Sequence, residues 1–183
     1  MEFGTPLTQG TPQAIQQSPA VLEAVLFEQL SGANHAWTMA PGLLHAAYEG
    51  LKHHGSDALK AAYLGKIASG EWLATLCLTE AHAGSDLGQV RTRALARPAG
   101  RYGLLLFLAP KMLPDGTRNT LHCERIEEEM GLHDSPTCVM RFDEASAWLI
   151  GESQRGLNAM FVMLNAARLH VGLQGLGLLD VAW

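Results

Sequence analysis

The chain has few cysteines, and they lack the spacing that disulfide frameworks or small zinc modules require. Its three cysteines, Cys77, Cys123 and Cys138, include no C-x-x-C pair. So sparse and odd a set is typical of reduced thiols, and we expect a cytoplasmic protein with buried thiols. The first residues, Met1–Thr5, have neither the basic start nor the apolar run of a secretory signal, and none is expected.

Long apolar runs and an excess of positive charge are also lacking. The strongest apolar run, Leu104–Leu108, has only the length of a strand, so no membrane span is expected. The 13 Lys and Arg residues are scattered along the chain, against 18 Asp and Glu residues. Without a basic stripe, neither nucleic acid nor a membrane surface is expected as a partner.

The sequence does contain enough apolar material for a folded domain. Of its 183 residues, 48% are hydrophobic and 17% are charged, a balance typical of globular proteins. A chain of this length buries roughly 70% of its extended-chain surface on folding. We therefore expect a hydrophobic core.

The first part of the chain indicates helices. Residues 1–17 are polar, and we interpret them as a lead-in or a tag. Apolar residues at helical spacing then predict a helical segment over residues 18–70. Its three helices begin after Ser18, near Pro41 and after Ser56, where capping residues or proline favour a helix start.

Short β-prone runs replace this pattern in residues 71–155. Turn signals rich in Pro, Gly and Asp separate the runs. The strand candidates are Trp72–Leu78, Val90–Ala96, Leu104–Ala109, Thr120–Glu127, Thr137–Phe142 and Trp148–Ile150. They predict a small antiparallel β-domain, either a sheet or part of a barrel.

A long helix is predicted for residues 156–183. Gly172, Gly175 and Gly177 lie inside it, where each costs about 1 kcal/mol relative to Ala. We therefore expect the backbone to approach a neighbouring helix closely. So long a helix needs partner helices to bury its faces, and we interpret it as the start of a C-terminal helical bundle. The predicted fold class is α+β.

The eight histidines form no familiar metal motif. None pair as H-x-x-x-H or H-E-x-x-H, and His53 and His54 lie at a helix end, where they face the helix dipole from different sides. The run Glu127–Glu129 is interpreted as an exposed strand or turn end rather than an acid–base cluster. No metal site is expected.

The most informative stretch of the chain is Leu76–Leu87. A strand end delivers Thr79, and Gly84 and Ser85 follow in a loop, so hydroxyl and backbone N–H groups gather at one spot. Such groups suit a ring carbonyl or a phosphate, and glycine lets a ligand approach the backbone. The sequence therefore predicts a small polar binding loop; the alternative is an ordinary strand-to-loop turn.

The motif C-x-T-E-x-x-A-G-S-D, which starts at Cys77, closely resembles the flavin-contacting loop of the acyl-CoA dehydrogenases. Further segments that resemble this family are Ser31–Leu43, Tyr63–Trp72, Met130–Cys138 and Asn165–Arg168. Glu129 stands where the family usually has Lys. The segment Leu106–Asn119 is similar to the branch that includes methylthiopropanoyl-CoA dehydrogenases.

The resemblance implies FAD-dependent α,β-dehydrogenation of an acyl-CoA thioester, with electrons passed to an electron-transfer flavoprotein. The residues that it implies for FAD contact are Leu76, Leu78, Thr79, Gly84 and Ser85. Ser85, Asn165 and Arg168 would contact the acyl-CoA; Asn165 and Arg168 are spaced to share a helix face. The family also implies a homo-oligomer.

Three departures from the family stand beside the resemblance. The early N-terminal helices are absent, and several strands are missing near Ala96–Tyr102. The rest of the C-terminal bundle, with the catalytic glutamate, is expected beyond Trp183, so no catalytic residue is expected within the chain. Three interpretations stay open: an acyl-CoA dehydrogenase seen in part, an inactive shortened relative that acts as a binding or assembly module, and an acyl-CoA oxidase.

Overall fold

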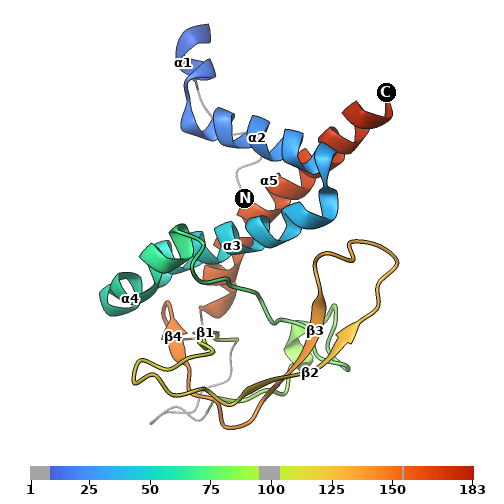
Figure 1. The fold of residues 1–183 in the computed structure, drawn as a ribbon. Coiled ribbons are helices and arrows are strands. Elements are labelled where there is room, and N and C mark those ends of the chain that lie inside the picture. The colour runs from blue at the N-terminus through green and yellow to red at the C-terminus, as the bar shows by residue number, and fades with distance from the viewer. Residues whose placement is uncertain (1–8, 95–103, 154) are drawn as a thin grey trace.

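A computed structural model describes residues 9–94, 104–153 and 155–183 (Figure 1). The helices are α1 (Pro12–Gln16), α2 (Pro19–Ala33), α3 (His35–His54), α4 (Asp57–Ala68), the 3₁₀ helix η1 (Leu87–Gln89) and α5 (Gly156–Ala182). The strands are β1 (Leu106–Leu108), β2 (Leu121–Glu127), β3 (Thr137–Phe142) and β4 (Trp148–Ile150). The α+β class and the order of helices, strands and long helix are confirmed. The missing block expected near Ala96–Tyr102 lies outside the described residues.

Capping side chains set the starts of α3 and α4. The Ser56 hydroxyl accepts a hydrogen bond from the Leu59 N–H at 3.3 Å, as its N-cap position predicts. The predicted start of the second helix near Pro41 is wrong, because Asn34 caps α3 by accepting from the Trp37 N–H at 2.9 Å. Pro41 therefore lies inside the helix, where it removes one backbone donor without ending it.

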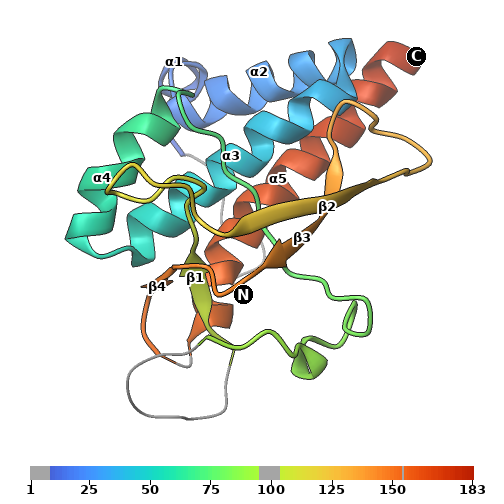
Figure 2. The same cartoon turned by 60° about the horizontal axis from the view of Figure 1, so that its bottom comes forward.

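The helix α5 crosses α2 and α3 and holds the helical layer together (Figures 1 and 2). Its closest backbone approach is at Gly177, where an added Cβ would collide with the Glu28 carbonyl oxygen. On α2, a Cβ at Gly32 would meet the Gly177 carbonyl oxygen at 3.1 Å. The close approach expected from the helix glycines is thus confirmed at Gly177, whereas Gly172 and Gly175 face open space.

The strands form two separate two-stranded antiparallel sheets, β1–β4 and β2–β3. Leu106 pairs with Ile150 in the first sheet and Leu121 with Phe142 in the second, which has a bulge between Cys123 and Arg125.

Two of the strand candidates are not strands. Residues 72–78 and 90–94 form no strand in the described structure, because no neighbouring strand supplies them with a hydrogen-bond ladder; residues 95 and 96 lie outside the described part. The three cysteines, expected to be buried, are all exposed free thiols.

The main apolar core lies where α3, α4 and α5 meet the β1–β4 sheet. It consists of Leu51, Leu59, Tyr63, Ile67, Ile150 and Ala159. Backbone hydrogen bonds from Gly151 to the His54 carbonyl, 2.9 Å, and from Gly156 to the Leu104 carbonyl, 3.1 Å, tie the two parts together.

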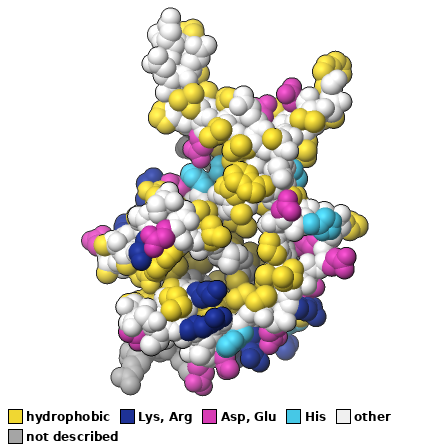
Figure 3. All heavy atoms as spheres, in the orientation of Figure 1, with side chains coloured by type: hydrophobic (Ala, Val, Ile, Leu, Met, Phe, Trp, Pro, Cys, Tyr) yellow, Lys and Arg dark blue, Asp and Glu magenta, His cyan; other side chains and the backbone are white. Residues whose placement is uncertain are grey.

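Many other apolar side chains reach the surface (Figure 3). On α5 the exposed large apolar residues are Leu157, Phe161, Leu169, Val171, Leu176, Leu178, Leu179 and Val181. This exposure agrees with the expectation that α5 cannot bury all of its faces within the chain. Among the described helices, none combines the length and the apolar character needed to cross a membrane.

The glycine contact between α2 and α5 gives a stability prediction. We expect Gly177→Ala to lower the free energy of unfolding by about 1–3 kcal/mol, because the new methyl group would push the Glu28 backbone away. The matched change Gly175→Ala meets open space and should stabilise α5 by about 0.5–1 kcal/mol. Urea unfolding of both variants checks this; equal effects would contradict the close helix crossing.

Candidate functional site

The predicted binding loop is built around a tight turn. Residues 72–79, which form neither helix nor strand, lead from α4 into the turn Glu80–Ala83. Two backbone hydrogen bonds close the turn: Glu80 N–H to the Ala83 carbonyl, 3.2 Å, and Ala83 N–H to the Glu80 carbonyl, 2.9 Å. Ala83 is buried beneath it. This antiparallel bridge places Thr79 and Gly84, which flank it, on the two arms of one turn.

The Glu80 carboxylate holds the loop to the returning chain. One oxygen accepts from the Arg91 N–H and the other from the Thr92 N–H, both at 2.9 Å, while His82 Nε2 lies 3.3 Å away. Hydrogen bonds from Thr92 and Arg91 lower the pKa of Glu80 to about 2, because they stabilise its charged form. The carboxylate therefore acts as a fixed acceptor at neutral pH.

A second carboxylate shapes the far side of the loop. Asp86 caps η1 by accepting from the Gly88 N–H at 3.0 Å, and it also accepts from the Gln89 side chain at 2.9 Å. The bonds from Gln89 and Gly88 lower the pKa of Asp86. The carboxylates of both acidic residues in the motif therefore accept hydrogen bonds from this part of the chain. The Thr79 and Ser85 hydroxyls and the Gly84 backbone are left for a ligand.

The five residues predicted to contact FAD lie on this loop and the chain that enters it. Leu76 and Leu78 are half-buried, whereas Thr79, Gly84 and Ser85 are exposed. A Cβ added at Gly84 would meet nothing within 4 Å, so the backbone there is open to an approaching group. In the described part of the chain, neither the Thr79 nor the Ser85 hydroxyl is hydrogen-bonded to protein. The arrangement presents donors and acceptors to a polar ring edge or a phosphate.

The other predicted substrate residues lie on α5. Arg168 donates to the Asn165 side-chain oxygen at 3.4 Å, and its guanidinium carbon lies 5.9 Å from the centre of the Phe161 ring. The two residues share one exposed helix face, as their spacing predicts. Figure 2 shows the green segment around residues 75–92 on the side of the β-strands and α5 among the helices, so the residues predicted on this segment and those on α5 form two groups.

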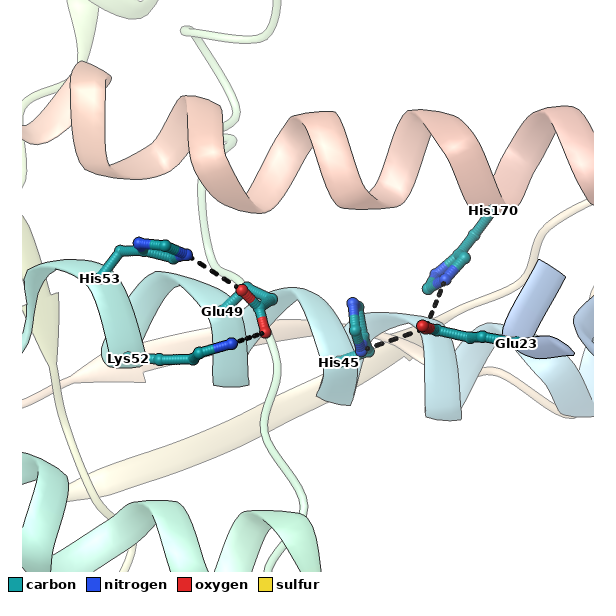
Figure 4. Close-up of polar contacts among 6 residues, drawn as sticks. All are labelled: Glu23, His45, Glu49, Lys52, His53 and His170. Carbon is teal, nitrogen blue, oxygen red and sulfur yellow. Dashed lines mark hydrogen bonds and ion pairs between the residues drawn. The ribbon is translucent and has the colours of Figure 1, made fainter. Parts of the chain in front are cut away.

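One cluster was missed by the sequence analysis. Glu23 of α2, His45 of α3 and His170 of α5 converge between the helices, and the two imidazoles point at the same carboxylate (Figure 4). A cavity of about 80 Å³ adjoins them. No spacing rule finds this cluster, because its members come from three different helices and their proximity depends on how these helices cross.

No protein-family model matches the chain. It is 34% identical over 90% of its length to 3-methylmercaptopropionyl-CoA dehydrogenase of Ruegeria pomeroyi, and 29% identical over 90% to the broad-specificity linear acyl-CoA dehydrogenase FadE5 of Mycobacterium tuberculosis. The fold is similar to butyryl-CoA dehydrogenase from Megasphaera elsdenii, with a TM-score of 0.73, 21% identity, and 89% of this chain and 50% of that one covered.

The chain corresponds to only part of these relatives. It covers 35% of the Ruegeria protein and 34% of the Mycobacterium protein. The matches nevertheless run through both the helical and the β parts of the chain, and the solved structure repeats the same arrangement of these parts. Sequence and fold together therefore place this chain in the acyl-CoA dehydrogenase family.

Proposed function

We propose that the chain supplies the flavin-contacting part of an FAD-dependent acyl-CoA dehydrogenase. The observation that carries the proposal is the Glu80–Ala83 turn, which presents Thr79, Gly84 and Ser85 on an open surface while the loop's own carboxylates are already used. The relatives that carry dehydrogenase names support the same activity.

The residues present fit such a cofactor. Leu76 and Leu78 offer apolar side chains beside the turn, and the Thr79 and Ser85 hydroxyls offer hydrogen bonds to a polar ring edge. The open backbone at Gly84 leaves room for a ligand that a side chain would exclude. Bound FAD would supply the hydride acceptor for the dehydrogenation.

The proposal gives this chain binding and orienting roles. Asn165 and Arg168 would hold the CoA part of the substrate, since an amide and a guanidinium donate to amide or phosphate oxygens. Ser85 would contact the substrate on the CoA side of the loop. The catalytic glutamate is not among the residues that we assign to this chain, and the resemblance expects it beyond Trp183.

The proposal extends to partners and location. An electron-transfer flavoprotein would accept the electrons, and a homo-oligomer would complete the helical bundle. A cytoplasmic location suits the exposed Cys123 and Cys138 thiols, which would stay reduced there.

The exposed apolar side of α5 favours a second candidate function, in which the chain acts as a binding or assembly module without turnover.

A binding measurement with FAD separates the two candidates. We expect the purified chain to take up FAD and to show a flavin absorption band. Thr79→Val removes one hydrogen-bonding group and should weaken FAD binding roughly 2- to 10-fold. Gly84→Val fills the open backbone face and should weaken it more.

The control for these variants is Thr137→Val on β3, another exposed threonine, which should leave FAD binding unchanged. If no FAD binds, or if Thr79→Val and Gly84→Val bind as well as the unaltered chain, the assignment of this loop is wrong. A folded chain without FAD would favour the assembly module.

The Glu80 carboxylate predicts a pH dependence of loop order. Its pKa is lowered from an ordinary value of 4.5 to about 2, so its stabilising bonds are fully present above pH 4.5 and are lost as the pH falls through about 2. Glu80→Gln keeps one acceptor and should speed hydrogen exchange at Arg91 and Thr92 by roughly three- to tenfold at neutral pH.

The measurement is amide hydrogen exchange by NMR, with a direct titration of the Glu80 carboxyl. Glu127→Gln is the matched control, because within residues 9–94, 104–153 and 155–183 the Glu127 carboxylate pairs only with the exposed Arg125 on its own strand. A carboxyl that titrates near 4.5, or exchange that is unchanged in Glu80→Gln, would show that Glu80 does not hold the loop.

A further inference from the structure

Three potential metal-ligand atoms from three helices lie together between α2, α3 and α5 (Figure 4). His45 Nδ1 is 3.5 Å and His170 Nε2 is 3.6 Å from the same Glu23 carboxylate oxygen. The three ligand atoms lie within 4.8 Å of one another. A carboxylate and two imidazoles therefore share one small volume.

These distances are long for hydrogen bonds. An N–H···O bond to a carboxylate is usually about 2.7–2.9 Å between heavy atoms. Two donor atoms on one tetrahedral Zn²⁺, with bonds of about 2.0–2.2 Å, lie roughly 3.3–3.6 Å apart. The two N···O spacings of the cluster match this second value, and the two imidazole nitrogens lie within 4.8 Å of each other.

The surroundings fix His170 in a ligand orientation. Its side chain is 7% exposed and stacks on Phe27, with ring centres 4.1 Å apart. Its Nδ1 atom is buried without a hydrogen-bond partner and lies on the side of Gly42, where an added Cβ would be 3.6 Å away. The ring is thus clamped with Nε2 toward Glu23.

Burial also favours the neutral ring that a metal needs. Desolvation, together with the neighbouring His45, lowers the pKa of His170, which favours the uncharged form of its imidazole. The adjoining cavity of about 80 Å³ has room for a water molecule beside the three ligands.

We propose that Glu23, His45 and His170 bind one divalent transition-metal ion of the Zn²⁺ type, with water in the fourth position. Two imidazoles and one carboxylate form the donor set of open tetrahedral zinc sites, whereas Mg²⁺ and Ca²⁺ prefer oxygen ligands alone. The ion would tie α2 to α3 and α5. This site is independent of the flavin loop, and it differs from the sequence-based expectation that no metal is bound.

The test is titration of the metal-free full chain with Co²⁺, followed by visible absorption and calorimetry, and then with Zn²⁺. We expect one ion per chain and tetrahedral Co²⁺ bands. With free Zn²⁺ at about a hundred times Kd, Tm should rise by roughly 5–10 °C. His45→Ala and Glu23→Gln should each weaken Co²⁺ binding at least about 10-fold.

The variants are chosen to keep the fold. His45 is half-buried and Glu23 is exposed, so neither change empties the core, and circular dichroism checks this. His53→Ala is the matched control: His53 also lies on α3 beside a carboxylate, Glu49, at 3.2 Å, but Lys52 takes the place of a third ligand (Figure 4). It should bind Co²⁺ as the unaltered chain does.

Two results would overturn the proposal. One is a folded chain that takes up no stoichiometric Co²⁺ or Zn²⁺. The other is binding that His45→Ala and Glu23→Gln leave unchanged, or that His53→Ala weakens equally, since the ion would then sit elsewhere.

Discussion

The crossing of α5 with α2 and α3 is the constraint on which the rest of the structure depends. The backbones of α2 and α5 touch because Gly32 and Gly177 have no side chains between them, and such close packing gains dispersion contacts that larger residues would prevent. At its start, α5 is hydrogen-bonded through Gly156 to Leu104, next to the β1–β4 sheet. One helix therefore positions the Asn165–Arg168 pair, the His170 cluster and the sheet.

On the β side of the molecule, hydrogen bonds rather than close helix packing determine the local structure. Most of β2 and the loop around Glu80 are exposed, so burial contributes little there. Charge-assisted hydrogen bonds that backbone amides donate to the Glu80 and Asp86 carboxylates fix the loop instead. A loop ordered by its own carboxylates keeps its hydroxyls and its Gly84 backbone free, which is the condition for a binding surface that is ready before a ligand arrives.

Features set by neighbours in sequence were predictable, and features set by distant partners were not. The Ser56 cap, the length of α5 and the shared face of Asn165 and Arg168 follow from local chemistry and the helical repeat. The start of α3 was predicted too late, near Pro41, because the helix begins after the Asn34 cap upstream.

The residues 72–78 have strand propensity, but a strand also needs a partner, and propensity does not reveal whether one is present. The Glu23–His45–His170 cluster required the crossing geometry of three helices, which no local pattern contains. The loop motif is the intermediate case: its residues are contiguous, so the sequence located it, while the role of Glu80 became visible only through the returning chain at Arg91 and Thr92.

The polar cluster and the glycine contact depend on each other. His170 and Gly177 lie about two turns apart on the same face of α5, so a shift of α5 along α2 would displace both at once. In the observed register of α5 against α2, Gly177 lies against Gly32 and the His170 imidazole lies beside the Glu23 carboxylate. In a shifted register a buried imidazole would lose its partners, which is costly inside a protein. Because much of α5 is apolar and exposed, apolar packing alone specifies its register weakly. The buried histidine and its two partners therefore give the helix crossing a specificity that its leucines do not.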